Sequence, residues 1–77
     1  MNRVYSEVTQ KWYNPDPEYV VRITNFKQYT LYMKHGVNPL DIYPSKDREN
    51  DRDILVMVFD RKESLPLYIK WQNHELV

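Results

Sequence analysis

Two histidines are the side chains best suited to acid–base chemistry or metal binding in this sequence. His35 and His74 lie far apart in the chain, near the ends of two different predicted helices. A catalytic or metal site would have to bring them together with a carboxylate such as Asp41 or Glu75. A histidine at a helix end usually faces water instead, so we predict no catalytic residue and no metal site.

The sequence lacks the residues that several other common kinds of active site require. The chain has no cysteine, which removes a disulfide framework, a thiolate zinc site and a thiol nucleophile. Gly36 is the only glycine, so a glycine-rich phosphate loop is missing. The acidic run from Asp47 to Asp53 is interleaved with arginines and lacks the spacing of a calcium loop. The sequence therefore predicts a non-enzymatic protein without a cofactor.

Aromatic residues are the feature most suited to function. Seven tyrosines, two tryptophans and two phenylalanines make up 14% of the chain, and exposed tyrosine and tryptophan are enriched at protein interfaces. We expect a core that includes Phe26, Tyr29, Phe59 and Tyr68. Leu31 joins the surface candidates because it falls on the far side of a predicted helix. The candidate partner-binding residues are Tyr5, Trp12, Tyr13, Leu31, Tyr43 and Trp71.

A second candidate surface would bind single-stranded nucleic acid, whose bases stack on aromatic rings. Its residues would be Tyr43, Lys46, Arg48 and Arg52. The four acidic residues interspersed here, Asp47, Glu49, Asp51 and Asp53, weaken this alternative. The formal net charge of +0 also lacks the excess of positive charge expected of a protein that binds duplex DNA through its phosphates.

These residues need elements to position them, and the first half of the compact region predicts a strand and a helix. The proline-rich segment 13–18 indicates a broad turn, and residues 19–24 alternate as a half-buried strand does. Asn25 is a suitable N-cap for a helix that Gly36 closes. Its apolar stripe should consist of Phe26, Tyr29, Thr30 and Met33, with Tyr32 at the margin.

The second half predicts two strands and a helix. Pro39 and Pro44 bracket a short strand that we expect at a sheet edge, and residues 45–53 form a solvated loop. Residues 54–59 are all apolar, as in a strand buried on both faces, so they should form the centre strand, antiparallel to the two others. Asp60 could cap the last helix, with Glu63 at capping-box spacing, but Pro66 would then break a backbone hydrogen bond inside the helix. We therefore expect a start at Ser64, which places Pro66 in the first turn. Its apolar residues wrap more than one face, so part of this helix should meet something other than the core.

Residues 3–13 alternate in polarity and predict a further strand, within an amino-terminal extension that covers residues 1–18. It is the best candidate within the chain to cover the second face of the sheet. Residues 19–77 should form one compact domain. The predicted fold class is α+β, a small mixed sheet of three to four strands with two helices on one face, in the order (β)-β-α-β-β-α.

From about Tyr19 to Leu76 the chain resembles a family of small uncharacterised proteins, a domain of unknown function, from low-GC Gram-positive bacteria and their phages and mobile elements. The resemblance rests, in order, on "VRITN", Gln28, "YMKHGVNPLDIY", "LVMVFD" followed by "ES", and "LYIKW". It implies a prokaryotic or phage origin and a compact α+β domain with no assigned catalysis. Pro66 departs from the more helical pattern of that family.

The expected function is a non-enzymatic protein–protein interaction module that binds itself or a host or phage protein. Inhibition of a host or defence factor is the version that the phage-like resemblance implies. The alternative is a single-stranded nucleic-acid accessory protein. No signal-peptide core and no membrane-length apolar run occur, so we expect a cytoplasmic protein without a membrane partner.

Overall fold

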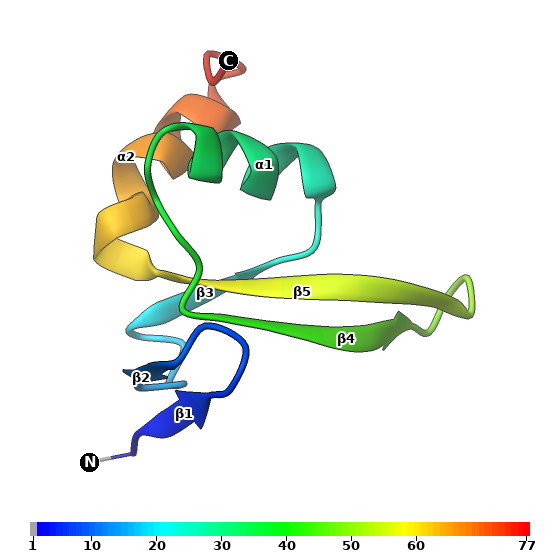
Figure 1. Cartoon of the computed structure of the whole chain (residues 1–77). Coiled ribbons are helices and arrows are strands. Elements are labelled where there is room, and N and C mark those ends of the chain that lie inside the picture. The colour runs from blue at the N-terminus through cyan, green and yellow to red at the C-terminus, as the bar shows by residue number, and fades with distance from the viewer. Residues whose placement is uncertain (1) are drawn as a thin grey trace.

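The computed structural model describes residues 2–77, which form three layers (Figure 1). Two helices lie above a three-stranded sheet, and a small two-stranded hairpin lies below it. The elements in chain order are β1 (Val4–Ser6), β2 (Lys11–Tyr13), β3 (Val20–Ile23), α1 (Phe26–Lys34), β4 (Asp41–Asp47), β5 (Arg52–Asp60) and α2 (Arg61–Gln72). The predicted α+β class, with both helices on one face of the sheet, is confirmed.

The apolar segment in the second half of β5 occupies the centre of the main sheet, as expected. The strand order is β3-β5-β4, and β5 is antiparallel to both neighbours. The two edge strands therefore run parallel to each other without touching, joined by α1 crossing over β5. Every hydrogen-bonded strand pair is antiparallel. The prediction of a mixed sheet was therefore wrong.

The two faces of β5 belong to two separate apolar clusters. Met57 and Phe59 point toward the helices, where they pack with Ile23 and Tyr32. Val58 points to the other face and packs with Val20 and Tyr13, the last residue of the hairpin. Alternation along the strand puts successive side chains on opposite faces, so a strand covered on both sides must be apolar throughout. The hairpin thus supplies part of the cover that the second face required.

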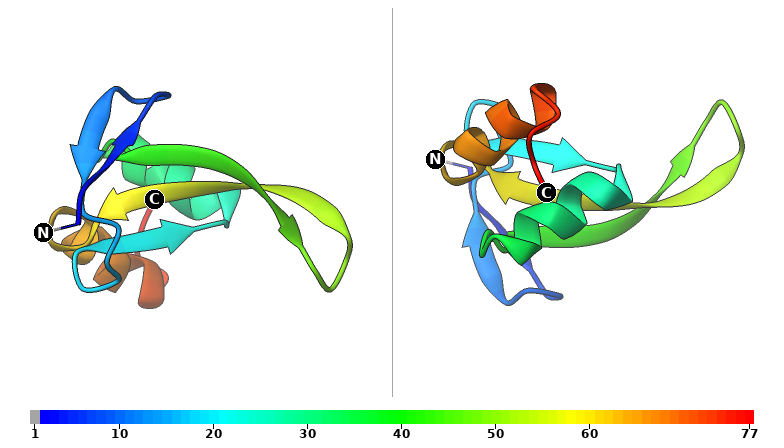
Figure 2. Two further views of the ribbon diagram at one scale, coloured as in Figure 1. Left: turned by 90° about the horizontal axis from the view of Figure 1, so that it is seen from below. Right: turned by 90° about the horizontal axis from the view of Figure 1, so that it is seen from above.

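The amino-terminal residues form two short strands, whereas we had predicted one. β1 pairs with β2 through a turn at residues 7–10, where Gln10 has a positive φ of 59°. The predicted loop 45–53 is also largely strand, because β4 and β5 continue to a turn at residues 48–51. The two strands form an arm that extends beyond the helices (Figure 2). In this arm oppositely charged residues face each other across the two strands, Lys46 opposite Asp53 and Asp47 opposite Arg52, which favours pairing without a buried apolar face.

Helix α1 is rotated relative to the predicted stripe. Asn25 caps it as expected, accepting the N–H of Gln28 on its side chain at 3.1 Å, and Gly36 has the expected positive φ. Gln28 and Tyr32 are the buried residues, while Phe26 is 75% exposed. The Gln28 Nε2 donates to the Tyr32 hydroxyl at 3.0 Å, so both polar groups can be buried at little cost.

Helix α2 begins at Arg61, three residues before the predicted start. The Asp60 side chain accepts the N–H of Glu63 at 2.9 Å, which makes Asp60 the N-cap. Pro66 therefore lies inside the helix and cannot donate to the carbonyl of Lys62, four residues before it. The cap and the packing of Leu67 and Trp71 on the core outweigh that missing bond. No helix among residues 2–77 is both long and apolar enough to cross a bilayer.

Candidate interaction surface

A carboxylate clamp fastens the hairpin to the sheet. Asp41, at the start of β4, accepts one hydrogen bond from the Ser6 hydroxyl at 2.6 Å and one from the Tyr13 hydroxyl at 2.5 Å. It also accepts the backbone N–H of Ile42 at 2.8 Å. Ser6 and Tyr13 are buried. Tyr13, predicted as a partner-binding residue, therefore belongs to the interior contact between the two layers.

The clamp shifts the pKa values of both partners. Burial alone would raise the pKa of Asp41, but the hydrogen bonds from Ser6, Tyr13 and Ile42 hold it below the ordinary 3.8. Burial, followed by the hydrogen bond to the anionic Asp41, raises the pKa of Tyr13 from 10.0 to about 12. The phenol is thus a neutral donor and the carboxylate an ionised acceptor over the whole neutral range.

Stability should depend on pH at both extremes because of this pair. The contribution of ionised Asp41 to the free energy of unfolding is complete above pH 3.8, and it is lost as the pH falls through the lower pKa that Asp41 has in the folded state. The contribution of the neutral Tyr13 is complete below pH 10.0 and is lost as the pH rises toward 12. Urea unfolding at a series of pH values measures this. The Tyr13→Phe variant should lose less stability than wild type between pH 10 and 12, and an equal loss would contradict the assignment.

The outer face of the hairpin carries two of the predicted partner-binding aromatics. Tyr5 and Trp12 are directly opposite each other on β1 and β2, with ring centroids 5.1 Å apart and ring planes at 54°. They are 46% and 59% exposed. Such a pair stabilises a short hairpin from one side. It also gives the molecule an exposed aromatic surface on the side opposite the helices.

The other predicted contact residues are less available. Leu31 and Trp71 are half-buried and pack on the core between the helices and the sheet. Tyr43 is half-buried against the cluster that Tyr13 and Val58 form. Leu31 was placed on the far face of α1 because the stripe was predicted from the wrong side of the helix. None of these three side chains presents a whole face to a partner.

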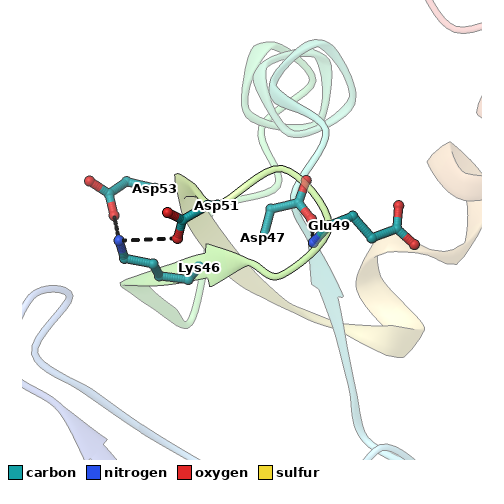
Figure 3. A network of polar contacts seen from close by, with 5 residues as sticks. All are labelled: Lys46, Asp47, Glu49, Asp51 and Asp53. Carbon is teal, nitrogen blue, oxygen red and sulfur yellow. Dashed lines mark hydrogen bonds and ion pairs between the residues drawn. The ribbon is translucent and has the colours of Figure 1, made fainter.

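The structure does not assemble the alternative nucleic-acid surface. Tyr43 and Lys46 are three residues apart on β4, so their side chains leave opposite faces of the ribbon. Lys46 Nζ lies 3.8 Å from the Asp51 carboxylate and 3.6 Å from that of Asp53 (Figure 3). Arg48 lies in the exposed turn and Arg52 opposite Asp47. Acidic neighbours therefore offset the positive charge of this arm.

The two histidines are also apart. His35 Nε2 lies 2.8 Å from the backbone oxygen of Val77, and His74 follows α2 with a positive φ of 58°. Within residues 2–77, no group of three histidine, aspartate or glutamate side chains is arranged to hold a metal ion.

The outer edge of β3 offers little to an added strand. Arg61 N–H donates to the Tyr19 carbonyl, so by alternation Val20 and Arg22 direct their backbone groups to the open side. The Val20 N–H already donates to Asp16 O at 3.2 Å, and the Val20 carbonyl accepts from the Arg61 guanidinium at 3.4 Å. Of these two residues, only Arg22 has a backbone N–H and a backbone carbonyl available to a partner strand.

The outer edge of β4 is obstructed in a different way. Leu40 N–H donates to the Val58 carbonyl, so the even-numbered residues of β5 face β4 and the even-numbered residues of β4 face outward. The outward N–H of Ile42 is taken by the Asp41 carboxylate, and Pro44 has none. A partner would therefore have to bind through side chains, since neither edge presents a continuous row of donors.

Helix α2 presents the most suitable side-chain surface. Leu65, Tyr68 and Ile69 have the helical spacing i, i+3, i+4 and are 48%, 43% and 52% exposed. We call these three residues the α2 stripe. Leu65 and Tyr68 also line a cavity of about 370 Å³ between α2 and β3, whose other apolar walls include Val21 and Ile23. An apolar stripe over an open cavity is the kind of surface that protein partners bury.

Sequence reasoning recognised that the last helix has two apolar faces but did not name the α2 stripe. Tyr68 was assigned to the core and Trp71 to the surface, whereas Trp71 packs on the core and Tyr68 faces outward. With a helix that begins at Arg61, the spacing of Leu65, Tyr68 and Ile69 predicts that the three residues share one face.

Comparisons of the chain with protein-family models, curated protein sequences and solved structures each produced no match. The resemblance of residues 19–76 to a family of low-GC Gram-positive bacteria and phages therefore stays a prediction.

Proposed function

We propose that this protein is a non-enzymatic protein–protein interaction module whose main contact surface is the α2 stripe. The observation that carries the proposal is the joint exposure of Leu65, Tyr68 and Ile69 on one side of α2, where Leu65 and Tyr68 also line the cavity beside β3. A helix needs one apolar face to pack on its own domain. A second apolar face costs solubility unless a partner covers it.

The partner is either a second copy of the chain or another protein of the cell or phage. The resemblance to phage and mobile-element proteins favours an inhibitor or modulator of a host or defence factor as the physiological role. The exposed pair Tyr5 and Trp12 supplies a second, separate aromatic contact on the far side of the molecule.

Removing the apolar character of the α2 stripe should abolish partner binding without unfolding the domain. In the double variant Leu65→Gln and Ile69→Gln, both side chains are about half exposed, so stability should change by no more than about 1 kcal/mol. A control is Leu55→Gln, which makes the same exchange at an exposed leucine of β5 outside the stripe.

The measurement has two parts. Light scattering on a size-exclusion column gives the mass of wild type and variants, and in-cell cross-linking followed by purification identifies bound proteins. Loss of a dimer, or of one specific cross-linked protein, in the stripe variant but not in Leu55→Gln supports the proposal. A wild type that is monomeric and captures nothing that depends on the stripe would contradict it.

A further inference from the structure

We infer that the amino-terminal hairpin, formed by β1, β2 and the turn between them, is a hinged cover that opens as one unit while the rest of the domain stays folded. The hairpin lies below the main sheet, on the side opposite the helices (Figure 1). Its opening uncovers the second face of the centre strand. The α2 stripe lies in the helix layer and is not affected, so this inference is independent of the proposed function.

The hairpin is separate from the main sheet in its backbone hydrogen bonds. β1 pairs only with β2, and the main sheet consists of β3, β5 and β4. Within the described part of the chain, the backbone–backbone hydrogen bonds of residues 2–13 stay inside the hairpin, such as the one from Gln10 N–H to the Ser6 carbonyl at 2.7 Å. No hydrogen bond of a strand ladder therefore has to break when the hairpin leaves the sheet.

Four side-chain donors attach the hairpin, and their acceptors lie on three consecutive residues. Besides the two hydroxyls of the clamp, Thr9 Oγ1 donates to the Leu40 carbonyl at 2.6 Å and Lys11 Nζ donates to the Pro39 carbonyl at 3.3 Å. Together with the Asp41 carboxylate these carbonyls form one short line of acceptors. Water replaces each partner once the hairpin moves away, so each of these hydrogen bonds adds only a modest net stability to the closed state.

The apolar core of the domain does not depend on the hairpin. The buried cluster on the helix face of the sheet contains no residue of the hairpin. On the other face, Tyr13 is the one hairpin residue of the buried cluster, where it packs with Val20 and Val58. A cavity of about 360 Å³ at this contact is lined by Tyr13 and Val20 among others, so the two layers are incompletely packed. The helices and the main sheet thus keep their contacts when the hairpin opens.

The hinge of this cover is at Asn14, because the residues that follow it are tied to the main domain. The Pro15 carbonyl accepts from Arg22 Nη2 at 3.1 Å, and the Pro17 carbonyl accepts from Arg61 Nε at 2.9 Å. None of these hydrogen bonds involves the hairpin, so they persist when it moves. A residue before proline is also restricted to extended conformations, which limits the range of the movement.

Hydrogen exchange of the native full-length chain measures the opening for each amide separately. The hydrogen-bonded amides of β1 and β2 should share one protection factor, at least about tenfold lower than that of the β5 amides. Measurements at two protein concentrations should give the same values, because the opening takes place within one chain.

Thr9→Val removes one attachment and keeps the shape of the side chain. It should lower the protection of the hairpin amides by about two- to tenfold, the effect of one net hydrogen bond, and leave the β5 amides unchanged. The matched control is Thr24→Val, which makes the same exchange at an exposed residue between β3 and α1 and should change neither set of amides.

A disulfide tests the cover in the opposite direction. The chain has no cysteine of its own, and the side chains of Ser6 and Asp41 meet at 2.6 Å, so Ser6→Cys with Asp41→Cys introduces a single possible cross-link. The oxidised form should protect the hairpin amides at least about tenfold more than the reduced form of the same variant. If this variant does not fold, Thr9→Val decides alone.

Three results would overturn the inference. Equal protection of the hairpin and β5, with Thr9→Val lowering both together, would mean that the hairpin leaves only when the whole domain unfolds. Different protection of β1 and β2 would mean that the strands separate one at a time. Protection that rises with protein concentration would mean that a second copy holds the hairpin in place.

Discussion

Replacing Phe59 with alanine should lower the free energy of unfolding by about 3–5 kcal/mol, the range for a fully buried aromatic residue. Phe59 lies on the centre strand with no exposed surface, and its ring meets that of Tyr32 edge-on at a centroid distance of 5.1 Å. A chain of this length is stabilised by only about 4–12 kcal/mol. Much of the population should therefore be unfolded or close to unfolding at physiological temperature.

Val58→Ala is the matched comparison, because it removes a buried side chain from the opposite face of the same strand. Val58 is fully buried against Val20 and Tyr13. It should cost less than Phe59→Ala, since fewer apolar atoms are lost. Urea unfolding followed by circular dichroism measures both. A cost for Phe59→Ala below about 1 kcal/mol would mean that the helices do not pack on this face as described.

Replacing Asp41 with alanine should lower stability by about 2–3 kcal/mol, because hydrogen bonds to a charged acceptor are worth about 1.5–3 kcal/mol and donors are left without a partner. The donors are the buried Ser6 and Tyr13 hydroxyls. The loss should be concentrated in the hairpin, whose amides should exchange with solvent faster while the amides of β5 stay protected.

Asp47→Ala is the control for the loss of a hydrogen-bonding carboxylate. Asp47 accepts the Glu49 N–H and the Asn50 side chain, each at 3.0 Å, and these hydrogen bonds also lower its pKa. It sits next to the exposed turn of the arm, so its removal should have a small effect on stability. If hairpin exchange is the same in Asp41→Ala as in Asp47→Ala, the clamp does not hold the hairpin.

The elements that local signals specify were predictable from the sequence. The run from Ile54 to Phe59 needed cover on both faces, and only the centre of a sheet provides it. Asn25 and Gly36 mark the ends of α1 through short-range hydrogen bonds and a backbone angle, and both act as predicted.

The errors arose where packing or an unusual backbone angle outweighed the local pattern. Gln28 reads as a surface residue until its hydrogen bond to Tyr32, one turn along the same helix, is known; that bond lets Gln28 and Tyr32 face the core together, while Phe26 faces water. The turn of the hairpin uses Gln10 at positive φ, a residue that does not signal such a turn. Asp60 and Ser64 are both plausible caps, and the packing of Leu67 and Trp71 on the core favours the earlier start.

The candidate surfaces were predictable in kind and only partly in position. Tyr5 and Trp12 are exposed as expected, because a short hairpin has only one face to bury. Tyr13 was predicted at the surface but is buried, because its hydroxyl donates to Asp41, a residue that no local pattern connects to it. The α2 stripe was hidden by the assignment of Tyr68 to the core.

The order of strands in the sheet also affects when the protein can fold during synthesis. Val20 pairs with Asp60, which the ribosome adds 40 residues later. β3 and β4 are not hydrogen-bonded to each other, and each pairs only with β5. No strand of the main sheet therefore has a partner until β5 has been synthesised. Until then the apolar residues of β3 and α1 remain open to chaperones, and the nascent chain should become protease-resistant in a single late step.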